Sequence, residues 1–159
     1  MPRPHPARLA AALLASAALA SAFLLAGCDA LRGSAPAPTP GDFGALTLAL
    51  AQRDIRVEGV VSGDAGCDDA SLAPTAISFT ADGLDQPAVK VRVYLFRDDA
   101  AYGRRRPDVD TCAAAWATDP ATFELVDASP WVLAGQGPWG AEFKAAVRAA
   151  LTAAASGTG

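Results

Sequence analysis

The stretch Val89-Lys90-Val91-Arg92-Val93-Tyr94-Leu95-Phe96 alternates more regularly than any other part of the chain. Its aliphatic residues all fall on one side of the alternation, and the other side carries Lys90, Arg92, Tyr94 and Phe96. A period of two residues is typical of a β-strand, and a helix would repeat every 3.6 residues. The sequence therefore predicts a central antiparallel strand over residues 89–96.

Shorter segments on either side of this strand predict the rest of the domain. Alternation predicts further strands at four places, namely 55–61, 76–80, 123–126 and 131–134. Apolar residues at helical spacing predict helices over 42–53 and 141–152. The order predicts an α+β two-layer sandwich with an antiparallel sheet of four or five strands and two main helices. The domain is expected to span 42–155, followed by a disordered tail over 156–159.

The segment between the central strand and the fourth strand predicts a shorter helix. Asp98 or Asp99 can cap a helix that starts there, and Pro107 is expected to end it near Arg105. Residues 112–117 are expected to add a further helical turn.

The N-terminal part carries a basic start, with Arg3 and Arg8, and an apolar run from Leu9 to Ala26. The run ends in Leu24-Leu25-Ala26-Gly27-Cys28, which resembles the lipobox of bacterial lipoproteins. The resemblance implies that residues 1–27 are a signal peptide that is removed. It also implies that Cys28 receives a lipid, which anchors the protein to the cell membrane on the extracytoplasmic side. The alternative is an uncleaved membrane anchor, because eighteen apolar residues can just span a bilayer.

Residues 28–41 connect this cysteine to the domain and contain prolines at 36, 38 and 40. Alternating proline favours extended polyproline II, so the segment is expected to be a tether. The body is also similar to small uncharacterised bacterial lipoproteins in three stretches, IRVEGVV (55–61), VKVRVYLF (89–96) and WVLAGQGPWGAEFKAAVRAAL (131–151). That resemblance implies a fold and no particular activity.

Removal of residues 1–27 would leave 132 residues with 11 basic and 17 acidic side chains, a formal net charge of −6. An acidic domain argues against a nucleic-acid partner. The single histidine, His5, lies in the leader. A mature chain without histidine lacks the commonest general base and the commonest transition-metal ligand, so we expect no enzyme and no cofactor.

The other two cysteines, Cys67 and Cys112, are expected to form a disulfide in an exported chain, with two buried thiols as the alternative. Carboxylates that could gather around this cystine make a weak candidate for a calcium site: Asp64, Asp68, Asp69, Asp108 and Asp110. The alternative is solvated loop charge, partly neutralised by the run 104–106. That arginine run could also contact anionic lipid, although an intramolecular charge cluster is the simpler account.

Residues 135–140 match the pattern G-x-G-x-x-G. No second parallel strand can follow within the 19 remaining residues, and Pro138 lacks a backbone N–H for a phosphate. The pattern therefore predicts a tight turn between a strand and a helix.

The aromatic side of the central strand is the candidate binding face, made of Tyr94 and Phe96 together with Trp131. Tyr94 and Phe96 point away from the valine side, so something other than the main core must cover them. The binding interpretation predicts an open aromatic groove there, and the alternative is a second core covered by helices or by the segment at 130–131. The sequence thus predicts a membrane-anchored, non-catalytic module that binds an unknown protein or small molecule of the cell envelope. The alternative is a carboxylate-dependent envelope enzyme such as a glycan hydrolase, which needs two carboxylates roughly 5 to 10 Å apart in one cleft.

Overall fold

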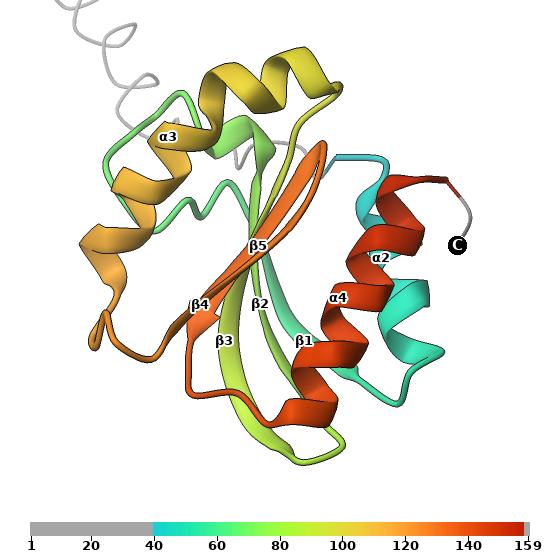
Figure 1. Ribbon diagram of the computed structural model, residues 1–159. Coiled ribbons are helices and arrows are strands. Elements are labelled where there is room, and N and C mark those ends of the chain that lie inside the picture. The colour runs from blue at the N-terminus through green and yellow to red at the C-terminus, as the bar shows by residue number, and fades with distance from the viewer. Residues whose placement is uncertain (1–39, 158–159) are drawn as a thin grey trace, which may run out of the picture. The chain divides into compact units, whose positions relative to one another are not determined.

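The computed structural model describes residues 40–157, which all lie in one compact unit of the chain. A five-stranded sheet, entirely antiparallel, has the strand order β1-β2-β3-β5-β4 (Figure 1). The strands are β1 (Arg56–Ser62), β2 (Ala76–Gly83), β3 (Gln86–Leu95), β4 (Phe123–Ala128) and β5 (Trp131–Gln136). The helices are α2 (Phe43–Ala51), α3 (Asp99–Trp116) and α4 (Ala141–Ala155), with a short 3₁₀ turn η1 (Ala73–Thr75). The predicted α+β class and antiparallel sheet are confirmed.

The strand predicted over 89–96 is β3, and it occupies the middle of the sheet. Its register is continuous on both sides, with Val93 opposite Ile77 of β2 and Leu133 of β5. The alternation places Val91, Val93 and Leu95 on the sheet face that α2 and α4 cover. The alternation of β3 therefore determines which side chains of β2 and β5 share its two faces, because both strands pair with it in continuous register.

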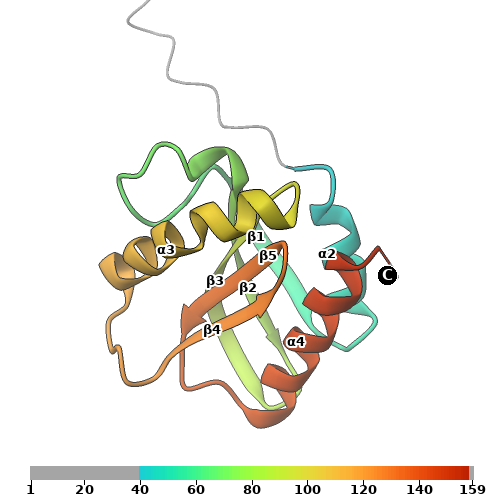
Figure 2. The ribbon, with the colours of Figure 1, turned by 45° about the horizontal axis from the view of Figure 1, so that its top comes forward.

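The first core lies between this face and the helix pair α2 and α4, which pack side by side (Figure 2). The apolar stripe of α4, from Phe143 through Val147 to Leu151, is fully buried in it. The edge-on contact of Trp139 with Phe143, at 5.5 Å between ring centroids, closes the core at the start of α4. Burial of such apolar surface is the main favourable term for a domain of this size.

The second core lies on the opposite face of the sheet, beneath α3 and the 63–72 loop. The two-helix prediction did not include this layer, and the prediction that Pro107 ends the helix is wrong. α3 continues for 18 residues with Pro107 inside it, and Asp98 caps it by accepting a hydrogen bond from the Ala101 N–H. Proline at 107 removes the backbone donor to Gly103, but both residues are exposed, so water can satisfy that carbonyl.

Several predicted features lie outside the described residues. They are the leader (1–27), Cys28 and most of the tether (28–41), and the last two residues of the tail (156–159). Within residues 40–157, no helix combines the length and apolar character that crossing a bilayer requires.

Candidate functional site

The aromatic side of β3 is not an open groove. Tyr94 is completely buried and Phe96 is 4% exposed, because α3 and the 63–72 loop cover them. The Tyr94 hydroxyl donates to the Ala65 carbonyl at 2.8 Å, and Trp131, 4% exposed, belongs to the first core instead. Of the two alternatives for Tyr94 and Phe96, the structure shows the second core, and Trp131 packs in the first.

The disulfide between Cys67 and Cys112 is present, with its Cα atoms 5.3 Å apart, and it joins the 63–72 loop to α3. The carboxylates named as weak calcium candidates do not form a ligand cluster around it. Among residues 40–157, no three Asp, Glu, Cys or His side chains come close enough together to hold a metal ion. Most of these carboxylates are paired with basic side chains. Asp69 and Asp108 share Arg105, Asp110 pairs with Arg106, and Asp64 pairs with Lys90 and Arg92, whereas Asp68 is exposed.

Asp64 forms the most buried charge network of the domain. It accepts from Arg92, which is only 9% exposed, at 3.1 Å, and it lies 3.1 Å from the Lys90 ammonium. The Arg92 guanidinium also stacks on the Trp116 ring at 4.4 Å. Burial raises the pKa of Asp64, but the Ser78 hydroxyl, Lys90 and Arg92 outweigh it and lower the pKa to about 2. The network fastens the 63–72 loop to β3.

The arginine run over 104–106 is mainly an intramolecular charge cluster. Arg105 pairs with Asp108 and donates to Ser71, and Arg106 pairs with Asp127 of β4. Arg104 is exposed and lines an open depression of about 650 Å³ together with Pro40 and Phe96. Two of the three arginines are thus occupied in holding α3 to the rest of the domain.

The G-x-G-x-x-G stretch makes the predicted turn, which joins β5 to α4. The Asp85 carboxylate occupies the N-terminus of α4, where it accepts from the Phe143 N–H at 3.0 Å and also from Glu142. A Cβ at Gly140 would lie 2.2 Å from this carboxylate, so a side chain there cannot fit. The position that a phosphate would take at a helix N-terminus is therefore filled by a residue of the chain itself.

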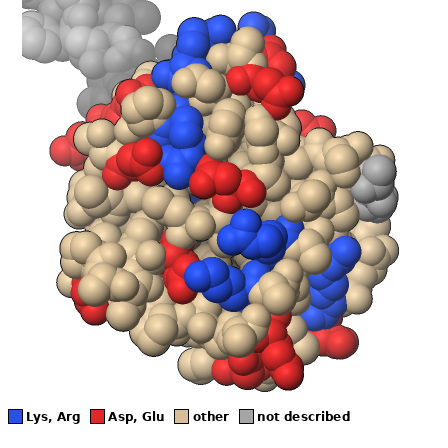
Figure 3. All heavy atoms as spheres, in the orientation of Figure 1, with Lys and Arg blue, Asp and Glu red and all other residues tan. Residues whose placement is uncertain are grey.

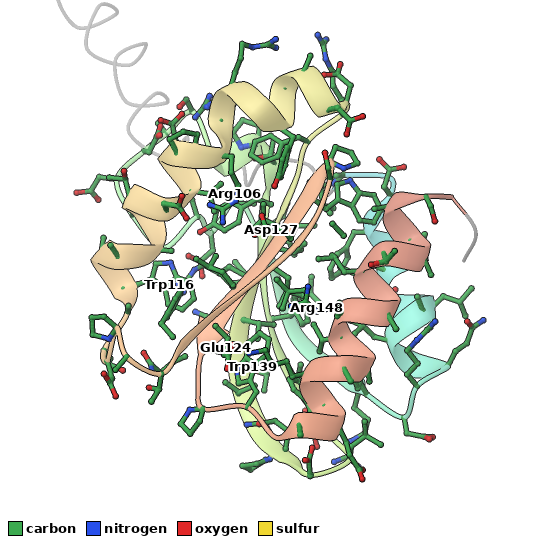
Figure 4. All side chains as sticks on the ribbon, viewed as in Figure 1. Arg106, Trp116, Glu124, Asp127, Trp139 and Arg148 are labelled. Carbon is green, nitrogen blue, oxygen red and sulfur yellow. A yellow bond between two sulfur atoms is a disulfide. The ribbon has the colours of Figure 1, made fainter. Side chains whose placement is uncertain are left out.

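The two outer strands of the sheet differ in how their free edges are protected. Along β4, charged side chains of both signs cover the face between α3 and α4 (Figure 3). Arg106 reaches from α3 to Asp127, Lys144 pairs with Glu124, and Arg148 of α4 lies on the other side of the hairpin (Figure 4). Burial raises the pKa of Asp127, but hydrogen bonds from Arg106 and Tyr102 outweigh it and keep the pKa below its ordinary value. Charged side chains on an outer strand discourage pairing with a further strand.

The β1 edge also carries charged side chains, Arg56 and Glu58, but its surroundings differ from those of β4. Beside the β1 edge runs an open groove of about 910 Å³ between α2 and β1, which we call the α2–β1 groove. Its apolar wall is formed by Leu48 and Ala51 of α2 and by Ile55 and Val57. Leu48 is 53% exposed because it lies off the stripe that α2 buries in the first core. Large apolar side chains left exposed beside a free strand edge are characteristic of an interaction surface.

Charged groups line the rim of the α2–β1 groove. They are Asp54, Arg56 and Glu58, and Arg56 pairs with Asp82 on β2. The hydrogen bond from Arg56 lowers the pKa of Asp82 below its ordinary value. The groove floor is tight: a Cβ on Gly83 would lie 2.1 Å from the Asp54 carbonyl oxygen. The groove therefore offers apolar walls, charges of both signs and a free backbone edge.

Sequence reasoning did not identify the α2–β1 groove, although one signal was present. Leu48 is a leucine outside the stripe formed by Phe43, Leu46 and Leu50, and such a residue must either find a second neighbour or stay exposed. Alternation predicts the strand over 55–61, but nothing in its pattern shows that it lies at the edge of the sheet.

Comparison of the chain with models of protein families, with curated proteins and with solved structures finds no match.

Proposed function

We propose that this chain is a lipid-anchored protein of the bacterial cell envelope whose domain is a non-catalytic interaction module. The partner binds in the α2–β1 groove and adds an extended segment to the free edge of β1. One observation carries the binding part: half-exposed Leu48 shares an open groove with Ile55 and Val57 beside β1, an outer strand of the sheet. Strand addition supplies affinity through backbone hydrogen bonds, and the groove supplies side-chain specificity.

The anchoring part is supported by the lipobox at residues 24–28 and by the proline-rich segment that follows it. A Cys28→Ala variant should accumulate as unprocessed precursor, whereas the parent protein should carry a lipid and partition into detergent. Mass spectrometry of the detergent-extracted chain measures both. A parent chain that carries no lipid would refute the anchor.

The groove is tested with a photoreactive amino acid at position 48 of the full chain, expressed in cells. The expected result is a discrete cross-linked adduct to a polypeptide on irradiation. The matched control places the same amino acid at exposed Ala114 on α3, on the other side of the sheet. Equal cross-linking at both positions, or none at position 48, would argue against the α2–β1 groove as the binding site.

The enzymatic alternative can be tested in the same groove, because Asp54 and Glu58 both line it. A glycan hydrolase would use such a pair as acid and base or nucleophile. Release of reducing ends from peptidoglycan by the purified chain, abolished in both Asp54→Asn and Glu58→Gln, would favour the enzyme over the interaction module.

A further inference from the structure

The exposed edge of β1 carries a charge pattern that complements itself. We infer that the segment bound in the α2–β1 groove is the β1 strand of a second copy of this chain, paired antiparallel about a two-fold axis at Val57. This inference rests on the proposed interaction function, since it names the partner of that same groove. A two-fold axis needs one surface that meets its own copy, with each contact made twice.

The length of the pairing segment is set by the backbone. Asp54 at φ 58° precedes the extended stretch, and Gly59 at φ 61° follows it, where the β1–β2 register shifts. Residues in the left-handed region interrupt an extended ladder. Residues 55–58 are thus the part of the edge that can pair regularly, and the short stretch admits few registers.

Charge selects one register among these. Pairing about Val57 sets Arg56 opposite Glu58 of the second copy, and the symmetry repeats this contact. Pairing about Arg56 would set two arginines face to face, and pairing about Glu58 would set two glutamates face to face. Opposite charges directly across a strand pair are favourable and like charges are not. Arg56 can meet a second carboxylate because 74% of its side chain remains exposed beside Asp82.

The same register also aligns the apolar walls. Val57 lies against the first core, on the face of β1 that α2 covers. Directly opposed residues of an antiparallel pair share one face of the sheet, so both α2 helices come to the same side. Leu48 of each copy then lies over the seam between the two β1 strands, which removes its exposed surface from water.

The short ladder suits copies that already share a membrane. The β-bulge that begins at Gly59 restricts the contact to a few residues, so the pairing of free domains is expected to be weak. Two copies held by lipid in one membrane meet at a high effective concentration, which strengthens a weak contact without adding new ones.

The test uses the full, detergent-extracted chain in three forms, wild type, Arg56→Glu and Glu58→Arg, each with a different affinity tag. Wild type should sediment as a concentration-dependent dimer. Each single variant places like charges opposite each other twice and should weaken dimerisation about tenfold or more. Mixing the two variants restores both opposite-charge contacts, so one tag should then retain the other. The matched control is Arg104→Glu on α3, which should dimerise like wild type.

Three results would overturn the inference: a monomer at all concentrations, a dimer indifferent to both charge reversals, or two variants that fail to associate when mixed. Mixing keeps the test independent of folding defects in either variant alone, since only complementary surfaces recover. If the chain is monomeric while position 48 cross-links a different polypeptide, this inference fails and the proposed function stands. If position 48 cross-links nothing and the chain is monomeric, both fail.

Discussion

At the scale of single residues, Asp64 shows how one carboxylate secures a long loop. Its pKa of about 2 in the folded chain lies below the value of 3.8 for an unperturbed aspartate. A lowered folded pKa means that the stabilisation is complete above pH 4 and is lost as pH falls towards 2. The shift corresponds to about 2 kcal/mol, because one pKa unit is about 1.4 kcal/mol.

We predict that Asp64→Asn lowers the free energy of unfolding at pH 7 by about 2 kcal/mol or more, because Arg92 is left buried without its carboxylate. Between pH 4 and pH 2, the free energy of unfolding should also fall less in the variant than in the wild type. Urea unfolding at several pH values measures both effects. Exposed Asp68→Asn, in the same loop, is the control. An Asp64→Asn profile parallel to wild type would contradict the assignment.

At the scale of secondary structure, the sequence predicts β3 correctly because its period is local, and it misreads α3 because a helix around proline depends on context. Three contacts with other parts of the chain hold α3 in place around Pro107: the Cys67–Cys112 disulfide, the Arg106–Asp127 pair and the edge-on contact of Trp116 with Phe123. None of these is visible in a window of neighbouring residues. Propensity is a weak prior that tertiary contacts override.

We predict that the paired substitution Cys67→Ser with Cys112→Ser lowers the free energy of unfolding by about 4 kcal/mol, since the bond closes a 45-residue separation. The loss should appear first in the second core, where Cys112 lies beside Tyr94. Near-ultraviolet circular dichroism and urea unfolding measure the two effects. Unchanged stability after the substitution would mean that the charge network alone holds the loop.

At the scale of the whole molecule, the aromatic side of β3 shows which features the sequence predicts. It predicts which side chains share a face, and it does not predict whether that face is covered. Alternation assigns Tyr94 and Phe96 to the face away from the valines, which is correct. Whether that face is open or covered depends on where α3 and the 63–72 loop return, and those elements are distant in sequence. The α2–β1 groove was missed for the same reason, because edge position is a property of strand order.

The two cores share β3, and this sharing should make the domain unfold as one unit. Val93 packs in the first core and Tyr94 in the second, so loss of this strand from the sheet would remove both cores together. Trp116 belongs to the second core, while Trp131 and Trp139 belong to the first, and Figure 4 shows Trp116 and Trp139 on either side of the β4–β5 hairpin. A variant carrying Trp131→Phe and Trp139→Phe therefore reports the second core alone.

In that variant, we predict that Trp116 fluorescence and far-ultraviolet circular dichroism give the same urea midpoint, because one cooperative transition governs both signals. In the Trp116→Phe variant, the remaining tryptophans report the first core. Their fluorescence and the far-ultraviolet circular dichroism of that variant should also share one urea midpoint. A Trp116 signal that changes at lower urea than the helical signal would show that α3 and the 63–72 loop unfold separately. The disulfide acts against such separate unfolding, since it keeps this loop joined to α3. The variant with both Cys67→Ser and Cys112→Ser is therefore where the two midpoints are expected to diverge, with the second core unfolding first.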